Sequence, residues 1–197
     1  MRTHAIVLAG GRGFRFGADK MRVDLQGFGM PWQIVWRRLG PLVNDMTIVG
    51  IDIPGGRHRR DSIRAGLAAV KAPRVIIAEG ARFLVSVQDF KEILNAESDA
   101  VAFGCSTTNN AVMDLGDSWA LVPRDLTKEV HTPQVFATDF LRELIEKFPY
   151  TPAIDEWSLA AAQNPEKCEM LPGNWRTALK LTNPDDLQIM RGILYGQ

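Results

Sequence analysis

The chain has 197 residues, of which 46% are hydrophobic and 23% are charged, and its basic and acidic residues balance. We expect a single domain over residues 1–197, with a substantial core. The balanced charge gives no overall field that would draw the chain onto nucleic acid or an anionic membrane, so we expect neither partner. The sequence has no apolar run of membrane-spanning length and no signal-peptide pattern, so we expect a cytoplasmic protein.

The chain has two cysteines and three histidines, and none lies at a spacing typical of a metal site. Cys105 and Cys168 form no paired motif, which favours a reduced setting. His4, His58 and His131 are scattered along the sequence. The sequence therefore predicts no zinc site.

A glycine-rich segment follows an apolar run near the N-terminus. Residues 5–8 are typical of a buried strand, and AGGRGFRFGADK follows directly at residues 9–20. Glycines let a backbone approach a ligand and turn its N–H groups inward, while Arg15 and Lys20 add positive charge. The segment matches neither a Walker loop nor a dinucleotide fingerprint, because its lysine and its third glycine are wrongly spaced. It predicts a polyphosphate site, with an ordinary strand-to-helix turn as the alternative.

Short apolar runs alternate with amphipathic segments through the first half of the chain. Runs typical of buried strands lie at residues 5–8, 46–51, 74–78 and 99–103. Segments that fit helices lie at residues 31–39, 61–70 and 87–94. Asp61 and Ser62 suit the cap of a helix, and Pro184 suits the start of a last one. The alternation predicts an α/β fold with parallel strands and helical crossovers.

The stretch at about residues 106–130 interrupts this alternation. Residues 111–113 and 119–122 are short apolar segments that flank a turn at residues 114–117. This pattern predicts a β-hairpin that projects from the sheet as an arm. Two interpretations stay open: the arm packs on a second subunit, or it folds onto its own domain.

Several further segments carry a family pattern. With the loop at residues 9–20, they are RRDSIRAGL at 59–67, TPQVF at 132–136, DEWS at 155–158 and LKLTNPDDL at 179–187. In this order they resemble the methylerythritol phosphate cytidylyltransferases over nearly the whole chain. The resemblance implies a Rossmann-like (GT-A-like) nucleotidyltransferase fold, with a mixed sheet, helices on both faces and a projecting β-arm.

The resemblance also implies a reaction. Family members use CTP, or another nucleoside triphosphate, and a phosphorylated polyol of the isoprenoid precursor pathway. A phosphate oxygen of the polyol attacks the α-phosphorus, and pyrophosphate leaves without a covalent enzyme intermediate. Mg²⁺, lysine and arginine would hold the two anions together and stabilise the charge that develops at phosphorus.

Individual residues acquire roles through the same resemblance. The catalytic residues, which would contact the triphosphate, are Arg15, Lys20 and Lys180. The nucleotide-binding residues would be Ala9, Gly10, Gly11, Gly13, Gly56 and Ser62. Arg124 and Thr132 would bind the polyol phosphate, with Arg124 supplied by the arm of the neighbouring subunit in a homodimer. Glu79 would bind the magnesium ion.

The same residues also have structural interpretations. Arg15 and Lys20 could be solvated surface charges. Ser62 could only cap a helix, and Arg124 could lie at the surface without a role. Lys180 lies in an apolar Leu-Lys-Leu segment that we interpret as a strand, where an unpaired ammonium is costly to bury. We therefore expect the Lys180 amine to have a partner.

Four departures from the family pattern concern the metal, the acceptor and the base. Glu79 stands where the family has an aspartate that binds magnesium, and its longer side chain alters metal geometry. A second aspartate is replaced by Thr177 or Ala178. The Asp-Thr-x-Lys segment is lost at residues 106–110, and Arg57 replaces an acidic residue that contacts the base.

Two alternative functions follow. LAGG at residues 8–11 and GADK at residues 17–20 also resemble molybdenum cofactor nucleotidyltransferases. The altered metal and polyol segments are also compatible with a catalytically weak homologue that binds a nucleotide.

Overall fold

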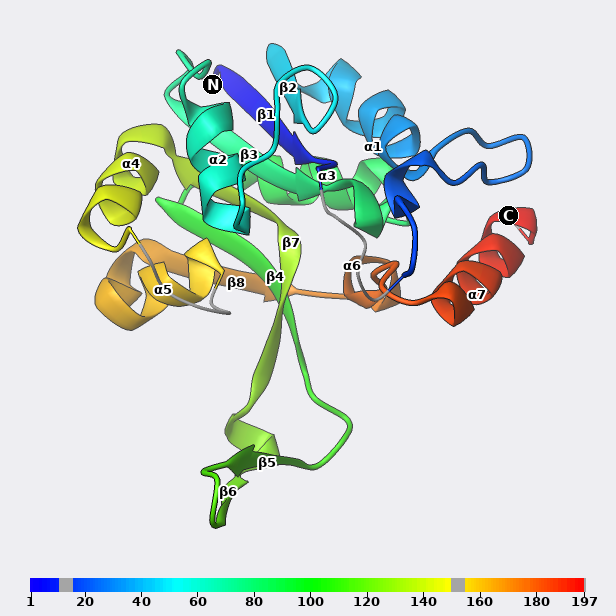
Figure 1. Ribbon diagram of the computed structural model, residues 1–197. Coiled ribbons are helices and arrows are strands. Elements are labelled where there is room, and N and C mark those ends of the chain that lie inside the picture. Colours follow the sequence, from blue (N-terminus) through cyan, green and yellow to red (C-terminus); the bar gives the residue numbers. More distant parts are fainter. Residues whose placement is uncertain (11–15, 150–154, 197) are drawn as a thin grey trace.

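The computed structural model describes residues 1–10, 16–149 and 155–196, and its centre is a six-stranded sheet (Figure 1). The strand order is β2-β1-β3-β7-β4-β8. The strands are β1 (Thr3–Leu8), β2 (Asp45–Val49), β3 (Arg74–Glu79), β4 (Ala100–Ser106), β7 (Lys128–Ala137) and β8 (Cys168–Pro172). Strand β1 is parallel to β2 and β3, and β4 is parallel to β8, whereas β7 runs antiparallel to β3 and β4. The sheet is therefore mixed.

Two strands differ from what the alternation predicts. Strand β7 is antiparallel because the chain returns from the arm directly beside β4, with no helical crossover between them. Strand β2 ends at Val49, before the expected residue 51. Gly50 there has a φ of +101°, a left-handed conformation that turns the chain out of the strand.

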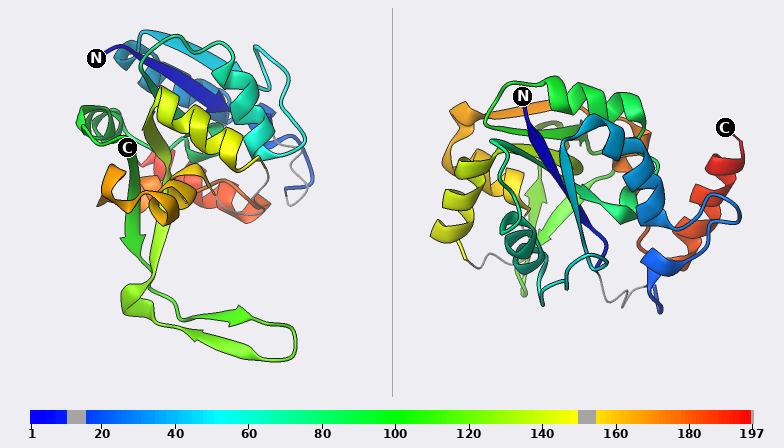
Figure 2. Two further views of the ribbon diagram at one scale, coloured as in Figure 1. Left: turned by 90° about the vertical axis from the view of Figure 1, so that its left-hand side faces the viewer. Right: turned by 90° about the horizontal axis from the view of Figure 1, so that it is seen from above.

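Helices cover both faces of the sheet (Figure 2). They are α1 (Pro31–Leu39), α2 (Arg59–Leu67), α3 (Val87–Asn95), α4 (Thr138–Lys147), α5 (Glu156–Gln163), α6 (Trp175–Ala178) and α7 (Pro184–Tyr195). The 3₁₀ turns are η1 (Lys20–Arg22), η2 (Gly40–Leu42), η3 (Gly80–Arg82), η4 (Arg124–Leu126) and η5 (Pro165–Lys167). The start of α7 at Pro184 is confirmed, and a first-turn proline suits a helix because its missing N–H would be unpaired there.

The start of α2 corrects the prediction that Asp61 and Ser62 occupy its cap. The helix begins at Arg59, and His58 is the residue that precedes it. The Asp61 carboxylate accepts a hydrogen bond of 3.0 Å from the His58 backbone N–H, so it caps the helix from within the first turn. The Ser62 hydroxyl has another partner, described below.

The two faces of the sheet have separate apolar cores, because successive residues of a strand point to opposite faces. From β1, Ala5 and Val7 enter the core under α1, α3 and α7. Ile6 enters the core under α2, α4 and α5. All three side chains are fully buried. Burial on both faces fixes the carboxyl end of β1, from which the site described below is built.

The chain between β4 and β7 forms the arm. Strands β5 (Ala111–Asp114) and β6 (Trp119–Val122) pair as an antiparallel hairpin outside the main sheet. The hairpin extends away from the body and does not fold back onto it (Figures 1 and 2). The arm is thus confirmed, and the interpretation that it folds onto its own domain is wrong. Its exposed apolar residues are Val112, Met113, Leu115, Trp119, Leu121 and Leu126.

Among the residues that the structure describes, no helix has the length and apolar character needed to cross a membrane.

Candidate active site

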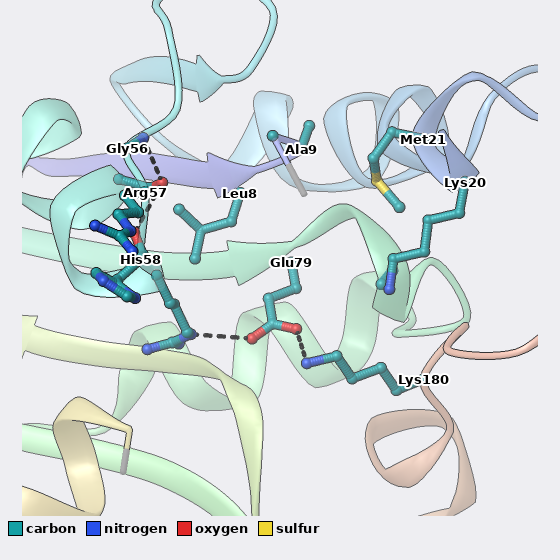
Figure 3. Close-up of a pocket in the computed structure, with 13 residues that line it drawn as sticks. Leu8, Ala9, Lys20, Met21, Gly56, Arg57, His58, Glu79 and Lys180 are labelled. Atoms are coloured by element: carbon teal, nitrogen blue, oxygen red, sulfur yellow. Dashed lines mark hydrogen bonds and ion pairs between the residues drawn. The ribbon is translucent and has the colours of Figure 1, made fainter. Parts of the chain in front are cut away.

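A pocket of about 320 Å³ lies at the carboxyl ends of β1 and β3 (Figure 3). Strand β1 is flanked by β2 on one side and by β3 on the other, and the connecting helices α1 and α2 lie on opposite faces. In open α/β sheets, the crevice where connections diverge in this way is the usual place for a ligand. The topology therefore favours a ligand site after Leu8, where the sequence also predicts one.

Close backbone contacts shape one wall of this pocket. A Cβ on Gly50 would lie 2.4 Å from the Gly10 Cα, and one on Gly56 would lie 2.2 Å from the Asp61 Cβ. Neither position has room for a side chain, so the segment after β2 packs directly on the end of β1. Ala9, Gly10 and Gly56 all line the pocket, as the nucleotide-binding prediction requires.

Ser62 lines the pocket, and its hydroxyl forms hydrogen bonds with backbone groups of the pocket wall. Its hydroxyl accepts a hydrogen bond of 3.0 Å from the Gly56 N–H and lies 3.4 Å from the His58 carbonyl oxygen, to which it can donate. The side chain is buried within the first turn of α2. Ser62 therefore holds the segment that contains Gly56 against the helix.

Glu79, at the end of β3, is the central charge of the pocket. One carboxylate oxygen lies 2.5 Å from the Lys180 Nζ, and the other lies 3.3 Å from the Arg59 Nε. Its side chain is only 11% exposed. Burial alone would raise the pKa of Glu79, but the cations of Arg59, Lys180 and Arg82 together lower it to about 2. The group is therefore a carboxylate at any ordinary pH.

Lys20 and Lys180 reach the same pocket from distant parts of the chain. The Lys20 ammonium donates a hydrogen bond of 2.8 Å to the Leu181 carbonyl oxygen, next to Lys180. Figure 3 shows both lysines on one side of Glu79, with Arg57 and His58 on the other. The expectation that Lys180 has a partner is confirmed by its ion pair with Glu79. The Leu-Lys-Leu segment is not a strand, however, but an irregular connection between α6 and α7.

The segment that carries Lys180 is held from three directions. Lys20 binds the Leu181 carbonyl, and the Leu181 N–H donates to the Ala81 carbonyl at 2.8 Å. The Arg82 guanidinium donates to the carbonyls of Thr177 and Ala178, each at 2.6 Å. These last carbonyls of α6 have no partner within the helix, so a cation suits them.

Two further motif segments meet through side chains behind the pocket. Arg59 forms an ion pair with Glu156, which is almost fully buried at the start of α5. The Gln134 amide donates a hydrogen bond of 2.9 Å to Asp155, whose carboxylate also caps α5 at Ser158. Segments that resemble one family in sequence are therefore assembled around one site.

Other predicted residues are not brought to the pocket. Arg124 lies in η4 on the arm. Its side chain is 55% exposed, and its Nε is 3.9 Å from a carboxylate oxygen of Asp125. Thr132 is buried in β7, and its hydroxyl finds no hydrogen-bond partner among the described residues. Neither residue lines the pocket. The predictions for Gly11, Gly13 and Arg15 lie outside the described residues.

Sequence reasoning missed the structural roles of three charged residues: Arg59, Arg82 and Glu156. In the sequence Arg59 is only the first residue of a motif segment, whereas in the structure it bridges Glu79 and Glu156. Arg82 binds the carbonyls that precede Lys180. The available signal was that a charged residue stood within a recognisable motif segment. The sequence does not show the partner of such a residue, because that partner lies far away along the chain.

The pocket does not present a ready-made magnesium site in its described part. Glu79 is the one carboxylate among the residues that line it, and both its oxygens already have cationic partners. Mg²⁺ demands near-octahedral oxygen ligands at about 2.0–2.1 Å. The arrangement of Glu79 therefore does not fit a metal ligand unless Lys180 or Arg59 moves away.

The sheet topology, the glycine-lined pocket after β1 and the two converging lysines are typical of a nucleotidyltransferase. A family model described as 2-C-methyl-D-erythritol 4-phosphate cytidylyltransferase matches residues 40–195. The chain belongs to this family. The match supports the first of the two families that the sequence resembles.

Similar proteins extend over almost the whole chain. The chain is 29% identical to the 2-C-methyl-D-erythritol 4-phosphate cytidylyltransferase of Phocaeicola vulgatus, over 96% of this chain and 98% of that protein. It is 25% identical to the enzyme of that name from Chlamydia felis, over 96% and 97%.

Solved structures support the fold. A 4-diphosphocytidyl-2C-methyl-D-erythritol synthase from Anaerococcus prevotii matches with a TM-score of 0.80 at 19% identity, over 98% of this chain and 96% of that one. The 2-C-methyl-D-erythritol 4-phosphate cytidylyltransferase of Thermus thermophilus matches with a TM-score of 0.78 at 20% identity, over 99% and 100%. The predicted Rossmann-like α/β fold is confirmed.

Proposed function

We propose that the protein transfers CMP from CTP to 2-C-methyl-D-erythritol 4-phosphate, a phosphorylated polyol, in a step of isoprenoid precursor synthesis. Membership of the family supports this reaction. The observation that carries it is the convergence of Lys20 and Lys180 on one glycine-walled pocket after β1.

In this reaction a phosphate oxygen of the polyol forms a bond to the α-phosphorus of CTP. The bond from that phosphorus to the oxygen that bridges it to the β-phosphorus breaks, and pyrophosphate leaves with the bonding electrons. The protein has to hold two anions together and to stabilise the charge on the phosphoryl oxygens. Lys20 and Lys180 would supply that charge from positions that the fold holds beside the pocket, and preorganised charges of this kind stabilise a transition state effectively.

The ion pair of Glu79 sets a condition for this role. Lys180 contacts Glu79 in the structure, so an incoming triphosphate has to share Lys180 with the carboxylate or displace it. Because Glu79 also contacts Arg59, it keeps a cationic partner when Lys180 turns to the nucleotide. Mg²⁺ would arrive with the triphosphate and be held chiefly by phosphate oxygens, which is how this ion commonly binds at such sites.

We also propose that the protein is a homodimer in which each arm reaches the site of the other subunit. The support is the arm itself, since a hairpin with several exposed apolar side chains is unusual for a surface without a partner. Arg124 lies on this arm, away from the pocket of its own chain. A cytoplasmic location stays a prediction from the sequence.

The test is pyrophosphate release by the full chain. The protein is incubated with Mg²⁺, each of the common nucleoside triphosphates in turn, and a panel of phosphorylated polyols that includes 2-C-methyl-D-erythritol 4-phosphate. We expect release that requires both CTP and this acceptor. Saturable nucleotide binding without acceptor-dependent release would support the binding-only alternative. Release with a different triphosphate would contradict the proposed preference for CTP.

A further inference from the structure

Three side chains with metal-binding atoms meet at the root of the arm, away from the pocket. Cys105 on β4 and Glu129 on β7 are directly opposite each other in the antiparallel pair. His131 follows Glu129 by two positions and so lies on the same face of the sheet. The ligand atoms of Cys105, Glu129 and His131 all lie within 4.8 Å of one another.

The separation of sulfur and nitrogen is close to that in a tetrahedral metal site. The Cys105 Sγ and the His131 Nε2 are 3.7 Å apart. Zinc bound at about 2.3 Å to sulfur and about 2.0 Å to nitrogen, in tetrahedral geometry, places these two atoms about 3.5 Å apart. A cation could therefore bridge them with a shift of a few tenths of an ångström.

Hydrogen bonds behind His131 determine which ring nitrogen is available. The Thr177 hydroxyl donates to the Asn174 carbonyl at 2.9 Å and accepts from the Asn174 N–H at 3.0 Å. Because this hydroxyl already donates its proton to the Asn174 carbonyl, it can only accept a hydrogen bond from the His131 Nδ1. The Thr177 Oγ1 and the His131 Nδ1 are 3.4 Å apart. The proton is thus placed on Nδ1, and Nε2 presents its lone pair towards Cys105. Second-sphere contacts of this kind orient metal-binding histidines in general.

Close packing also holds the imidazole of His131 in place. His131 is 3% exposed, and a Cβ on Gly173 would lie 3.1 Å from its Nδ1. Burial and the charge of Arg82 lower the pKa of His131 against the opposing charge of Glu129, which favours the neutral imidazole. Neutral imidazole is the form that binds a metal.

The charge of the three ligands suits a divalent cation. Burial and the neighbouring Glu129 raise the pKa of the Cys105 thiol, so a bound cation has to displace its proton. The resulting thiolate and the Glu129 carboxylate would carry two negative charges, which compensate a divalent cation. Glu129 is exposed and Cys105 is partly exposed, so the ion can enter from solvent and keep water as a fourth ligand.

We propose that Cys105, Glu129 and His131 bind a zinc-type divalent cation, with Thr177 as the second-sphere partner of the histidine. The sequence hides this site because its ligands come from two strands paired across the sheet. The ion would tie β4 to β7 where both leave the body to form the arm (Figure 1), and so fix the direction of the arm. This proposal does not rest on the proposed transfer reaction.

The test uses Co²⁺ as a spectroscopic probe on the reduced full chain, followed by displacement with Zn²⁺. We expect one Co²⁺ per chain, with a sulfur-to-cobalt charge-transfer band and the visible bands of a tetrahedral site. Cys105→Ser should abolish the charge-transfer band, whereas the matched variant Cys168→Ser should keep it. Thr177→Val should weaken the affinity about 10-fold to 100-fold, as loss of a second-sphere partner does elsewhere.

Three results would overturn the proposal: no stoichiometric Co²⁺ binding, a charge-transfer band that survives in Cys105→Ser, or one that is lost in Cys168→Ser. Glu129→Gln provides a variant at an exposed position, where a failure to fold is not expected. It should also weaken binding, and unchanged affinity would remove Glu129 from the site. Circular dichroism of each variant confirms that binding is compared between folded proteins.

Discussion

The Lys180 ammonium and the Glu79 carboxylate form an ion pair of 2.5 Å that joins the end of β3 to the connection before α7. Arg59 contacts the other Glu79 oxygen, so one nearly buried anion balances two cations of the pocket. The pair has two consequences. Glu79 contributes to folding stability through its lowered pKa, and Lys180 is held in the pocket by a contact that a triphosphate can replace.

The first prediction concerns folding stability at acidic pH. The pKa of Glu79 is about 2 in the folded chain, against an ordinary value of 4.5. The charged form of Glu79 therefore stabilises the folded chain at any pH above the pKa that the group has in the unfolded chain. This contribution is lost as the pH falls towards 2. The shift corresponds to about 3 kcal/mol in the free energy of unfolding. Urea unfolding measures the free energy of unfolding of wild type and of Glu79→Gln between neutral and acidic pH. The difference between the two free energies should become smaller as the pH falls.

A matched control for this effect is Glu92→Gln, at an exposed position on α3. The difference between wild type and this variant should stay small at every pH. If the difference for Glu79→Gln also stayed constant from neutral to acidic pH, the ion pairs of Glu79 would not exist in solution.

The second prediction concerns the two lysines. Lys20→Ala and Lys180→Ala each remove a fixed positive charge from the proposed phosphate site, and we expect kcat/KM for pyrophosphate release to fall about 100-fold or more. Lys91→Ala, at an exposed position on α3, serves as the control and should retain the wild-type rate. Near-normal turnover in both pocket variants, with the fold intact, would contradict the proposed mechanism.

The third prediction assigns a positioning role to Arg82. Its guanidinium donates from a single nitrogen, Nη1, to the Thr177 and Ala178 carbonyls that precede Lys180. A lysine ammonium sits on a flexible stem and does not hold its donors in the fixed plane of a guanidinium, so it would hold these carbonyls less precisely. Arg82→Lys should therefore lower kcat while changing the KM for CTP much less. Steady-state kinetics measure the two constants separately, and circular dichroism checks the fold. A purely structural role would instead lower the melting temperature and leave the kcat of the folded enzyme unchanged.

Local patterns predicted the parts of the fold that depend on neighbours in sequence. The helix at Pro31–Leu39 was predicted with its observed bounds, because apolar spacing and a first-turn proline specify a helix locally. The antiparallel direction of β7 was not predicted, since strand pairing is decided by distant segments. For the same reason Lys180 was recognised through a motif, whereas its contact with Glu79 was not. Cys105 and His131 carried no signal at all, because their spacing has meaning only across the β4–β7 pair.

The fourth prediction tests the arm as a dimer contact. Leu121 is 88% exposed on β6, and replacing it by serine removes apolar area that the dimer would bury. Leu121→Ser should shift the protein from dimer towards monomer in light-scattering measurements at matched concentration. Ile189→Ser is the control, because Ile189 is also exposed but lies on α7. A wild-type protein that is monomeric at every concentration would contradict the dimer.

The fifth prediction asks whether Arg124 acts in its own subunit or in the partner. Arg124→Ala and Lys180→Ala should each be inactive alone. In a two-fold dimer whose arms are exchanged, random mixing of the two variants makes hybrids with one intact site, which restores about a quarter of the wild-type activity. The subunits are mixed by partial unfolding and refolding, and pyrophosphate release is then measured. If Arg124 served its own chain, every site would keep one defect and no activity would return. Each variant refolded alone provides the baseline, because it controls for activity gained or lost in refolding itself.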